Sequence, residues 1–144
     1  MITVDTDKRR LDVERIHAFL TESYWAKGIP LGVVRRSIEG SLCFGLYDGD
    51  EQVGFARVVS DGATFAYLAD VFVLDSHRGR GHGKLLVSTV LAHPDLQGLR
   101  RWVLATRDAH ALYAQHGFTP LSNPQRFMER HDPDVYADVH QRHD

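Results

Sequence analysis

The chain has 144 residues, of which 43% are hydrophobic, and a formal net charge of −2 at pH 7. These values fit a single domain over residues 1–144 with an adequate core. The weak negative charge gives no general attraction to nucleic acid or to an anionic membrane, so neither partner is expected. The single cysteine, Cys43, excludes an internal disulfide and an all-cysteine metal site. Because the sequence shows no signal-like N-terminus and no apolar stretch of membrane-spanning length, we expect a cytoplasmic protein.

The N-terminal half carries the patterns of one short strand, two helices and a β-hairpin. Val13, Ile16 and Leu20 repeat at helical spacing, and Gly28-Ile29-Pro30 ends that region. The turn Asp48-Gly49-Asp50 separates two strand-like runs. The predicted elements are a strand at 2–4, helices at 12–21 and 31–38, the second ended by Gly40, and hairpin strands at 42–47 and 52–59.

The C-terminal half is predicted to alternate strands and helices. The run from Thr64 to Val73 is rich in aromatic and apolar residues, and we expect it to be buried on both faces. The strand–helix–strand order predicts that the apolar run 102–105 lies parallel to it. The other predicted elements are a helix that runs from a glycine-rich turn to about Leu91, a helix at 108–115 with Asp108 as its N-cap and Gly117 just beyond its end, final strands at Phe118 and 126–129, and a loosely ordered tail from Asp132.

The most informative segment is Arg78-Gly79-Arg80-Gly81-His82-Gly83-Lys84, which lies between an apolar strand and the start of a helix. Glycines let the backbone come close to an anion and direct N–H groups at it, and the helix N-terminus adds partial positive charge. Arg78, Arg80 and Lys84 add full charges. The segment therefore predicts a ligand that carries phosphate.

The spacing of these glycines excludes two familiar nucleotide-binding loops. A Walker A loop needs a glycine where Arg78 stands and a serine or threonine where Leu85 stands. The dinucleotide-binding fingerprint needs its third glycine one residue later than Gly83. It also needs an acidic residue about twenty residues further on, where an apolar run lies instead. The phosphate should therefore belong to another class of ligand.

Read as Arg/Gln-x-x-Gly-x-Gly/Ala, residues 78–83 resemble the pyrophosphate loop of the GNAT N-acetyltransferase superfamily. Residues 109–118, Ala-His-Ala-Leu-Tyr-Ala-Gln-His-Gly-Phe, are similar to a later segment of that family, Ala-x-x-Leu-Tyr-x-x-x-Gly-Phe. The two segments occur in the family's order, with a predicted helix and strand between them. By this resemblance the chain is identified as a small, stand-alone member of the superfamily.

The resemblance implies an α/β (α+β) fold with a mixed, mostly antiparallel central sheet, a splayed parallel strand pair and flanking helices. It implies acetyl-CoA as the donor co-substrate, an amine of a small molecule or peptide as the acceptor, and no metal ion. The pantetheine arm of acetyl-CoA would lie where the strands at 64–73 and 102–105 diverge. The implied cofactor-binding residues are Val71, Phe72 and Val73 through their backbones, Arg78, Gly79, Arg80, Gly81, His82, Gly83 and Lys84 at the pyrophosphate, and Thr106 and Tyr113.

The resemblance also suggests catalytic roles. Tyr113 matches the family tyrosine that gives a proton to the leaving thiolate, although it could instead be a packing residue; a phenol is protonated at neutral pH and suits the role. The resemblance does not decide whether Asp70, Tyr67 or water serves as the general base. Asp70 stands where some relatives carry an acid, and it could deprotonate or attract the acceptor, or could pair structurally with an arginine such as Arg57. Tyr67 replaces a glutamate of other relatives and is grouped with the acceptor-binding residues.

The acceptor site is implied to involve the loop between the first two helices. Tyr24 and Trp25 in this loop could form the walls of an amine pocket, because aromatic faces attract ammonium groups, or they could pack the loop onto the core. Arg35, Arg36 and Arg57 could instead bind a carboxylate of the acceptor. A homodimer is possible by analogy with the family. The alternative function is a non-catalytic sensor or interaction module that binds acetyl-CoA or CoA, which the altered base positions favour.

Overall fold

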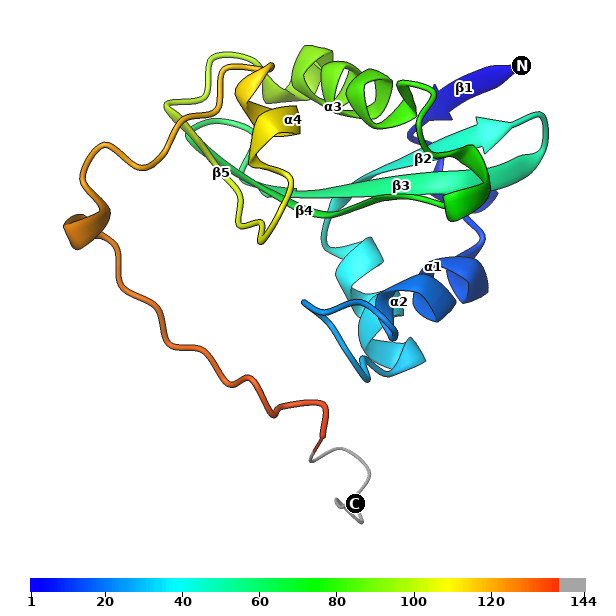
Figure 1. The fold of residues 1–144 in the computed structure, drawn as a ribbon, viewed down its shortest axis with the longest axis horizontal. Coiled ribbons are helices and arrows are strands. Elements are labelled where there is room, and N and C mark those ends of the chain that lie inside the picture. Colours follow the sequence, from blue (N-terminus) through cyan, green and yellow to red (C-terminus); the bar gives the residue numbers. More distant parts are fainter. Residues whose placement is uncertain (138–144) are drawn as a thin grey trace.

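The computed structural model describes residues 1–137 and builds them around a mixed sheet of five strands in the order β1-β2-β3-β4-β5 (Figure 1). The first four strands are antiparallel neighbours, and β4 and β5 run parallel. This arrangement confirms the predicted fold class. The strands are β1 (Ile2–Asp5), β2 (Leu42–Asp48), β3 (Glu51–Ser60), β4 (Phe65–Val73) and β5 (Arg101–Val103).

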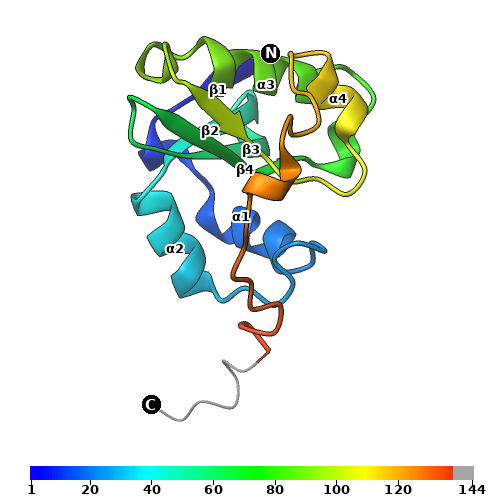
Figure 2. The same ribbon diagram turned by 90° about the vertical axis from the view of Figure 1, so that its left-hand side faces the viewer.

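Helices cover both faces of the sheet, with α1 and α2 on one side and α3 and α4 on the other (Figures 1 and 2). Their start and stop signals are local. The side chain of Asp12 accepts a hydrogen bond from the Arg15 N–H at 3.0 Å and caps α1, and Gly40 ends α2. The helices are α1 (Val13–Leu20), α2 (Leu31–Glu39), α3 (His82–Ala92) and α4 (His110–Ala114), and short 3-10 turns lie at Lys8–Arg10, Asp75–His77, Pro94–Leu96 and Pro124–Arg126. No helix among residues 1–137 has the length and apolar character needed to cross a bilayer.

The strands separate two buried clusters because successive side chains of a strand point to opposite faces. Phe44 of β2 packs on the α3 side with Leu86, whereas the adjacent Cys43 packs on the side of α1 and α2 with Ile16. Burial raises the pKa of the Cys43 thiol to about 11, so the thiol stays protonated at neutral pH. Cys43 is therefore a core residue, as its position in an apolar strand predicts.

The sheet opens at the carboxyl half of β4, and this opening positions the site. β5 pairs with β4 only from Phe65 to Tyr67, so β4 continues beyond β5 with an unpaired edge. On the other edge the register with β3 shifts, so that Asp70 and Val71 lie opposite the single residue Ala56. Asp70 has a φ of 53°, in the left-handed region that aspartate tolerates better than most side chains. The predicted splay of the parallel pair is therefore present, with a bulge beside it.

The prediction that the central strand is buried on both faces is wrong. Ala66 and Leu68 are buried, but Phe65 and Tyr67 between them are 40% and 37% exposed. The alternation arises because only one face of this end of β4 packs against the core. Tyr67 instead faces a pocket.

The predictions for the last third of the chain need two corrections. Asp108 does not cap α4; Ala109 stands at that position, and its N–H donates to Thr106 Oγ1 at 3.1 Å. Phe118 and residues 126–129 form no strand, and Pro120 and Pro124, which lack N–H groups, interrupt this stretch.

The loosely ordered tail predicted from Asp132 stays a prediction, and within it Val135 and Tyr136 are half-buried. Tyr136 packs against the cluster formed by α1 and α2, and the rest of the predicted tail, residues 138–144, lies outside the described residues.

Candidate active site

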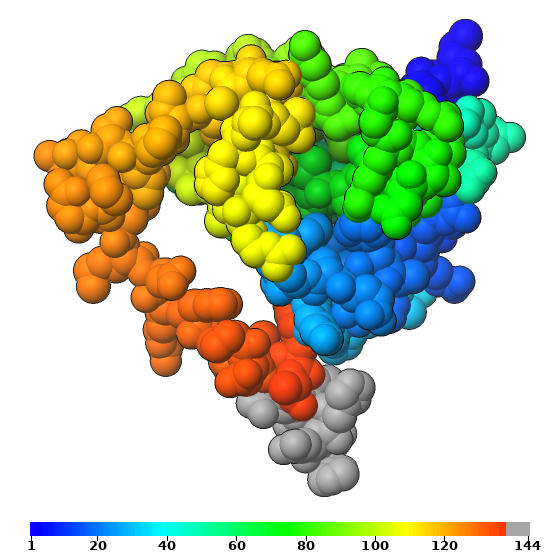
Figure 3. Space-filling model, viewed as in Figure 1, coloured from blue at the N-terminus to red at the C-terminus, as the bar shows by residue number. Residues whose placement is uncertain are grey.

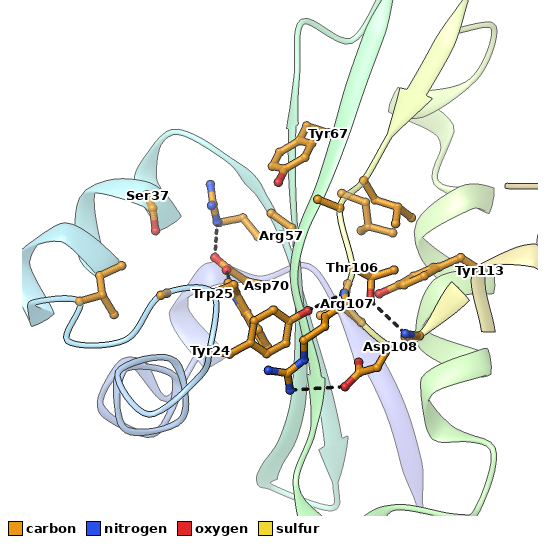
Figure 4. A pocket seen from close by; sticks show the side chains of 18 of the residues that line it. Tyr24, Trp25, Ser37, Arg57, Tyr67, Asp70, Thr106, Arg107, Asp108 and Tyr113 are labelled. Atoms are coloured by element: carbon orange, nitrogen blue, oxygen red, sulfur yellow. Dashed lines mark hydrogen bonds and ion pairs between the residues drawn. The ribbon is translucent and has the colours of Figure 1, made fainter. Parts of the chain in front are cut away.

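A pocket of about 450 Å³ lies where β4 and β5 diverge, bounded on the other side by the loop between α1 and α2 (Figures 3 and 4). It combines residues from the loop, β3, β4, the segment after β5, α4 and the C-terminal segment. The sequence-predicted site residues that line it are Tyr24, Trp25, Tyr67, Asp70, Val71, Thr106 and Tyr113. The fold thus brings together most of the residues predicted at the acetyl end and the acceptor end.

The open edge of β4 provides the backbone groups of the site. Beyond Tyr67 the strand has no partner on the β5 side within the described residues, so N–H and C=O groups there are available to an extended ligand. Phe72 contributes no side chain to the pocket, because its ring is buried and stacks on Phe19 with centroids 4.0 Å apart. The carbonyl of Val73 already accepts a hydrogen bond from Arg78 Nε at 2.9 Å.

The glycine-rich turn before α3 has the geometry of an anion site. Gly79 and Gly81 have φ values of 77° and 80°, and a Cβ added at either would meet nothing within 4 Å, which leaves space beside the backbone. Gly81 is the N-cap of α3, whose first-turn N–H groups point out of the helix end. Gly83 lies inside the helix, where an added Cβ would be 3.8 Å from Leu112 of α4.

The charged side chains of this turn divide into two groups. Arg78 is held by the protein, because its guanidinium also pairs with Asp75 at 2.7 Å. Arg80 and Lys84 are exposed and form no ion pair with another residue of the 1–137 segment. His82 is half-buried, with its ring 6.2 Å from that of His77. Arg80 and Lys84 are therefore the cations that can neutralise a bound phosphate.

Tyr113 extends from α4 into the pocket (Figure 4) and is 9% exposed. Burial, with a smaller contribution from the nearby Tyr24, raises the pKa of the Tyr113 phenol to about 12. The ring packs against Phe118 at 5.9 Å between centroids, which fixes its direction. The phenol is therefore a protonated hydrogen-bond donor throughout the neutral range.

Asp70 lies at the centre of a polar network at the acceptor end (Figure 4). Its Oδ1 accepts from Trp25 Nε1 and its Oδ2 from Arg57 Nε, each at 2.8 Å. The Arg57 and Asp70 side chains are only 18% and 10% exposed, and Arg57 also donates to Ser41 Oγ at 3.0 Å. The structure thus contains the arginine partner considered for Asp70, and it adds an indole donor that the sequence did not indicate.

The loop between α1 and α2, residues 21–30, is predicted to contact the acceptor and is called the acceptor loop here. It contacts the segment that follows β5. The Tyr24 hydroxyl accepts a hydrogen bond from the Arg107 N–H at 2.9 Å, and the Arg107 guanidinium lies 3.9 Å from the centroid of the Tyr24 ring. Trp25 meets Tyr24 edge-on, with ring centroids 5.1 Å apart. One wall of the pocket is therefore formed by Tyr24 of the loop together with Arg107, which lies more than eighty positions later in the chain.

Sequence reasoning misplaced some acceptor residues and missed others. Arg35 and Arg36 lie on the exposed side of α2 and do not line the pocket, so only Arg57 of the three candidate arginines reaches it. The pocket also contains Ser37, Arg107 and Tyr136, which no motif marked. The helical spacing of Ser37 with the buried Val34 and Ile38 was a usable signal, whereas nothing in the sequence placed Tyr136 near the loop.

The site has an open strand edge beside a buried tyrosine, and a helix that begins at a glycine-rich turn lies next to it. These features define the class of protein: a mixed α/β domain that can hold an extended ligand with an anionic end. A family model described as an acetyltransferase (GNAT) domain matches residues 39–120 of this chain. The chain therefore belongs to the GNAT family of acetyltransferases.

Individual relatives agree with this assignment. A protein of Gibberella zeae, named as a candidate acetyltransferase, is 33% identical over 136 residues, covering 78% of this chain and 76% of that protein. A GNAT-family crystal structure from Xanthomonas campestris pv. campestris is 57% identical with a TM-score of 0.93, covering 95% of this chain and 97% of that one. Rv2747 of Mycobacterium tuberculosis, solved with CoA, has the same fold at 23% identity and a TM-score of 0.65, over 83% of this chain and 73% of that one.

Proposed function

We propose that the protein transfers the acetyl group of acetyl-CoA to the nitrogen of an amine by direct attack on the thioester. The observation that carries this proposal is the free edge of β4, which begins after Tyr67 and runs beside Tyr113. An extended pantetheine arm has amide groups that can pair with such an edge. The turn at Gly79 and Gly81 and the cations Arg80 and Lys84 would bind the pyrophosphate. The thioester would then lie in the pocket.

The reaction forms a C–N bond and breaks a C–S bond. The neutral amine attacks the thioester carbonyl carbon, and the negative charge on the carbonyl oxygen is stabilised by a backbone N–H of the bulge at Asp70 and Val71 or of the residues that follow. The intermediate then expels the CoA thiolate. The amine loses its proton to water, so no dedicated base is required in this proposal.

Tyr113 acts on the leaving sulfur. A pKa of about 12 keeps the phenol protonated, while an ordinary thiol has a pKa of about 8.5, so full proton transfer from phenol to thiolate is uphill. Tyr113 therefore donates a hydrogen bond to the developing thiolate, and the proton that finally binds sulfur comes from solvent. In this role the phenol acts as a hydrogen-bond donor and keeps its proton.

Asp70 acts at the acceptor end as a positioning residue. Both of its oxygens already accept hydrogen bonds from Arg57 and Trp25, which favours this role over proton abstraction. Thr106 supports the site by fixing the start of α4 through the Ala109 N–H. Tyr24, Trp25 and Tyr67 contact the acceptor.

An acceptor screen tests the proposal. The purified protein is mixed with acetyl-CoA and a panel of amines, and release of the free CoA thiol is followed with a thiol reagent, with acetyl-CoA affinity measured separately by calorimetry. We expect binding of acetyl-CoA and thiol release that depends on the amine. Binding with no release on any amine would instead support the second candidate, a CoA-binding sensor, for which the paired state of Asp70 is the favouring observation.

A further inference from the structure

The C-terminal segment returns to the pocket after a long excursion. It leaves the α4 side of the molecule after Phe118, runs over residues 119–131, which are exposed except for the half-buried Asn123, and reaches the region of the α1–α2 loop (Figures 1 and 3). There a turn forms, in which the Asp134 N–H donates to Asp132 Oδ1 and the Ala137 N–H donates to the Asp134 carbonyl, both at 3.0 Å. This turn presents Tyr136 to the body of the protein.

Tyr136 contacts the acceptor loop itself. It lines the pocket, is half-buried and packs against the cluster that contains Ile29. A Cβ built on Gly28 would lie 3.7 Å from the Tyr136 Cβ, so only the space of about one side-chain atom separates the loop backbone from the tyrosine. Met128 in the same segment is 98% exposed. The segment therefore meets the body of the protein beside β5, where the Arg101 guanidinium lies 5.0 Å from the centroid of the Phe127 ring, and again where Tyr136 lines the pocket.

With Tyr136 in place, the acceptor end is aromatic on several sides. Tyr24 and Trp25 come from the loop, Tyr67 from β4 and Tyr136 from the C-terminal segment. The aliphatic side chains of Ile29 and Val33 line the same pocket. Such walls stabilise an apolar body through burial and stacking.

The charges of the pocket are already balanced. Its two acids are Asp70, whose oxygens bind Arg57 and Trp25, and Asp108, which pairs with Arg107 at 3.6 Å. A polycation would meet two guanidinium groups and no carboxylate without a cationic partner among the residues that line the pocket. Compounds with several ammonium groups should therefore bind weakly.

We propose that Tyr136 completes the acceptor pocket and that the pocket selects a compact monoamine with an aromatic or branched apolar body. The inference rests on the proposed acetyltransferase function and names the acceptor class of that same site. Tyr136 is a specificity residue, because it contacts the body of the acceptor and not the reacting atoms.

The test compares acceptors of different shape across matched variants. Benzylamine, ethylamine and spermidine are the acceptors, and the wild type, Tyr136→Ala, Tyr136→Phe and Met128→Ala are the proteins. We expect the wild type to have a kcat/KM for benzylamine at least about tenfold above those for the other two amines, the factor that corresponds to a modest aromatic contact. Tyr136→Ala should raise the KM for benzylamine about tenfold and change kcat and the KM for ethylamine little. The exposed control Met128→Ala should match the wild type, and Tyr136→Phe, which keeps the ring, should retain the preference for benzylamine over ethylamine.

Three results would overturn the inference while leaving the acetyltransferase function intact: equal losses for all amines, a parallel loss of acetyl-CoA affinity, or a preference for spermidine. If the wild type acetylates no amine, the proposed function itself fails, and the inference falls with it. Thermal unfolding shows whether Tyr136→Ala folds. If it does not, Tyr136→Trp is the deciding variant, and its larger ring should shift the preference from benzylamine towards ethylamine; no shift would count against the inference.

Discussion

The donor end and the acceptor end of the site are built in different ways. The donor end is a turn of consecutive residues, Arg78 to Lys84, joined to a helix whose N-terminus faces outward. The acceptor end is assembled from Trp25, Arg57, Asp70 and Tyr136, which are far apart in the sequence and come from four segments. The comparison teaches that the proposed anion site is encoded in a short stretch of chain, whereas the proposed acceptor site depends on tertiary contacts.

The largest expected effect comes from the residue between the two ends. Tyr113→Phe removes the donor to the leaving thiolate and should lower kcat about a hundredfold, with acetyl-CoA affinity changed less than about threefold. Steady-state kinetics and calorimetry measure the two quantities. Tyr47→Phe is the matched control, since Tyr47 is also buried and its hydroxyl has no hydrogen-bond partner among residues 1–137. An unchanged kcat for Tyr113→Phe would remove the catalytic role.

The next prediction concerns the donor end. Gly81→Val forces a β-branched residue to a φ of 80°, a strain of about 1–2 kcal/mol, and should reorient the N–H groups at the start of α3. We expect an acetyl-CoA Kd raised about tenfold or more. Gly98→Val places the same residue at a φ of 73° outside the site. Gly98→Val should lose as much unfolding free energy as Gly81→Val, but its Kd for acetyl-CoA should equal that of the wild type. Equal Kd values for the two variants would argue against the turn as the phosphate site.

At the acceptor end, Asp70→Asn removes the charge that pairs with Arg57 while keeping a residue that tolerates the left-handed φ of 53°. Loss of a hydrogen bond to a charged group should raise the acceptor KM about tenfold. A positioning role predicts that the pH–rate profile keeps its shape and midpoint. If the profile loses its acidic limb in Asp70→Asn, Asp70 is the general base. Trp25→Phe keeps an aromatic ring in the pocket wall and removes the other donor to Asp70, and it should show a smaller KM increase.

The last prediction is a pH dependence of stability, which has no effect on the protein at neutral pH. Unfolded Tyr113 ionises with a pKa of about 10, whereas burial raises the folded value to about 12. The unfolded state therefore loses its proton first as pH rises, so the free energy of unfolding falls between these values by at most about 1.4 kcal/mol per pH unit. Urea unfolding of the wild type and Tyr113→Phe on both sides of this window measures the difference. Parallel pH dependences would mean that the phenol ionises normally.

Much of the fold could be read from the sequence because its signals are local. Asp12, Pro30 and Gly40 mark the ends of the first two helices, and the hairpin turn at Gly49 lies between β2 and β3 as predicted. The errors cluster where context overrides pattern. The segment 126–129, with Phe127 and Met128 between two charged residues, is predicted as a strand by its sequence, but a strand needs a neighbouring strand with which to pair, and within the described residues this segment has none.

The candidate site shows the same division. The pairing of Asp70 with Arg57 was one of two alternatives that the sequence left open, and the register of β3 and β4 places both residues in one pocket. The roles of Arg107 and Tyr136 could not be predicted, because each depends on a loop or tail reaching the acceptor loop across the molecule.

The sequence by itself determined the features on which the proposed donor side rests: a glycine-rich basic turn, a tyrosine segment and membership of the GNAT family, since closely spaced residues carry these features. Only the tertiary structure decided which side chains surround the acceptor. The physical reason is that the pocket exists only once β5 has stopped pairing with β4, the bulge has turned Asp70 towards Trp25, and the C-terminal segment has brought Tyr136 against Gly28.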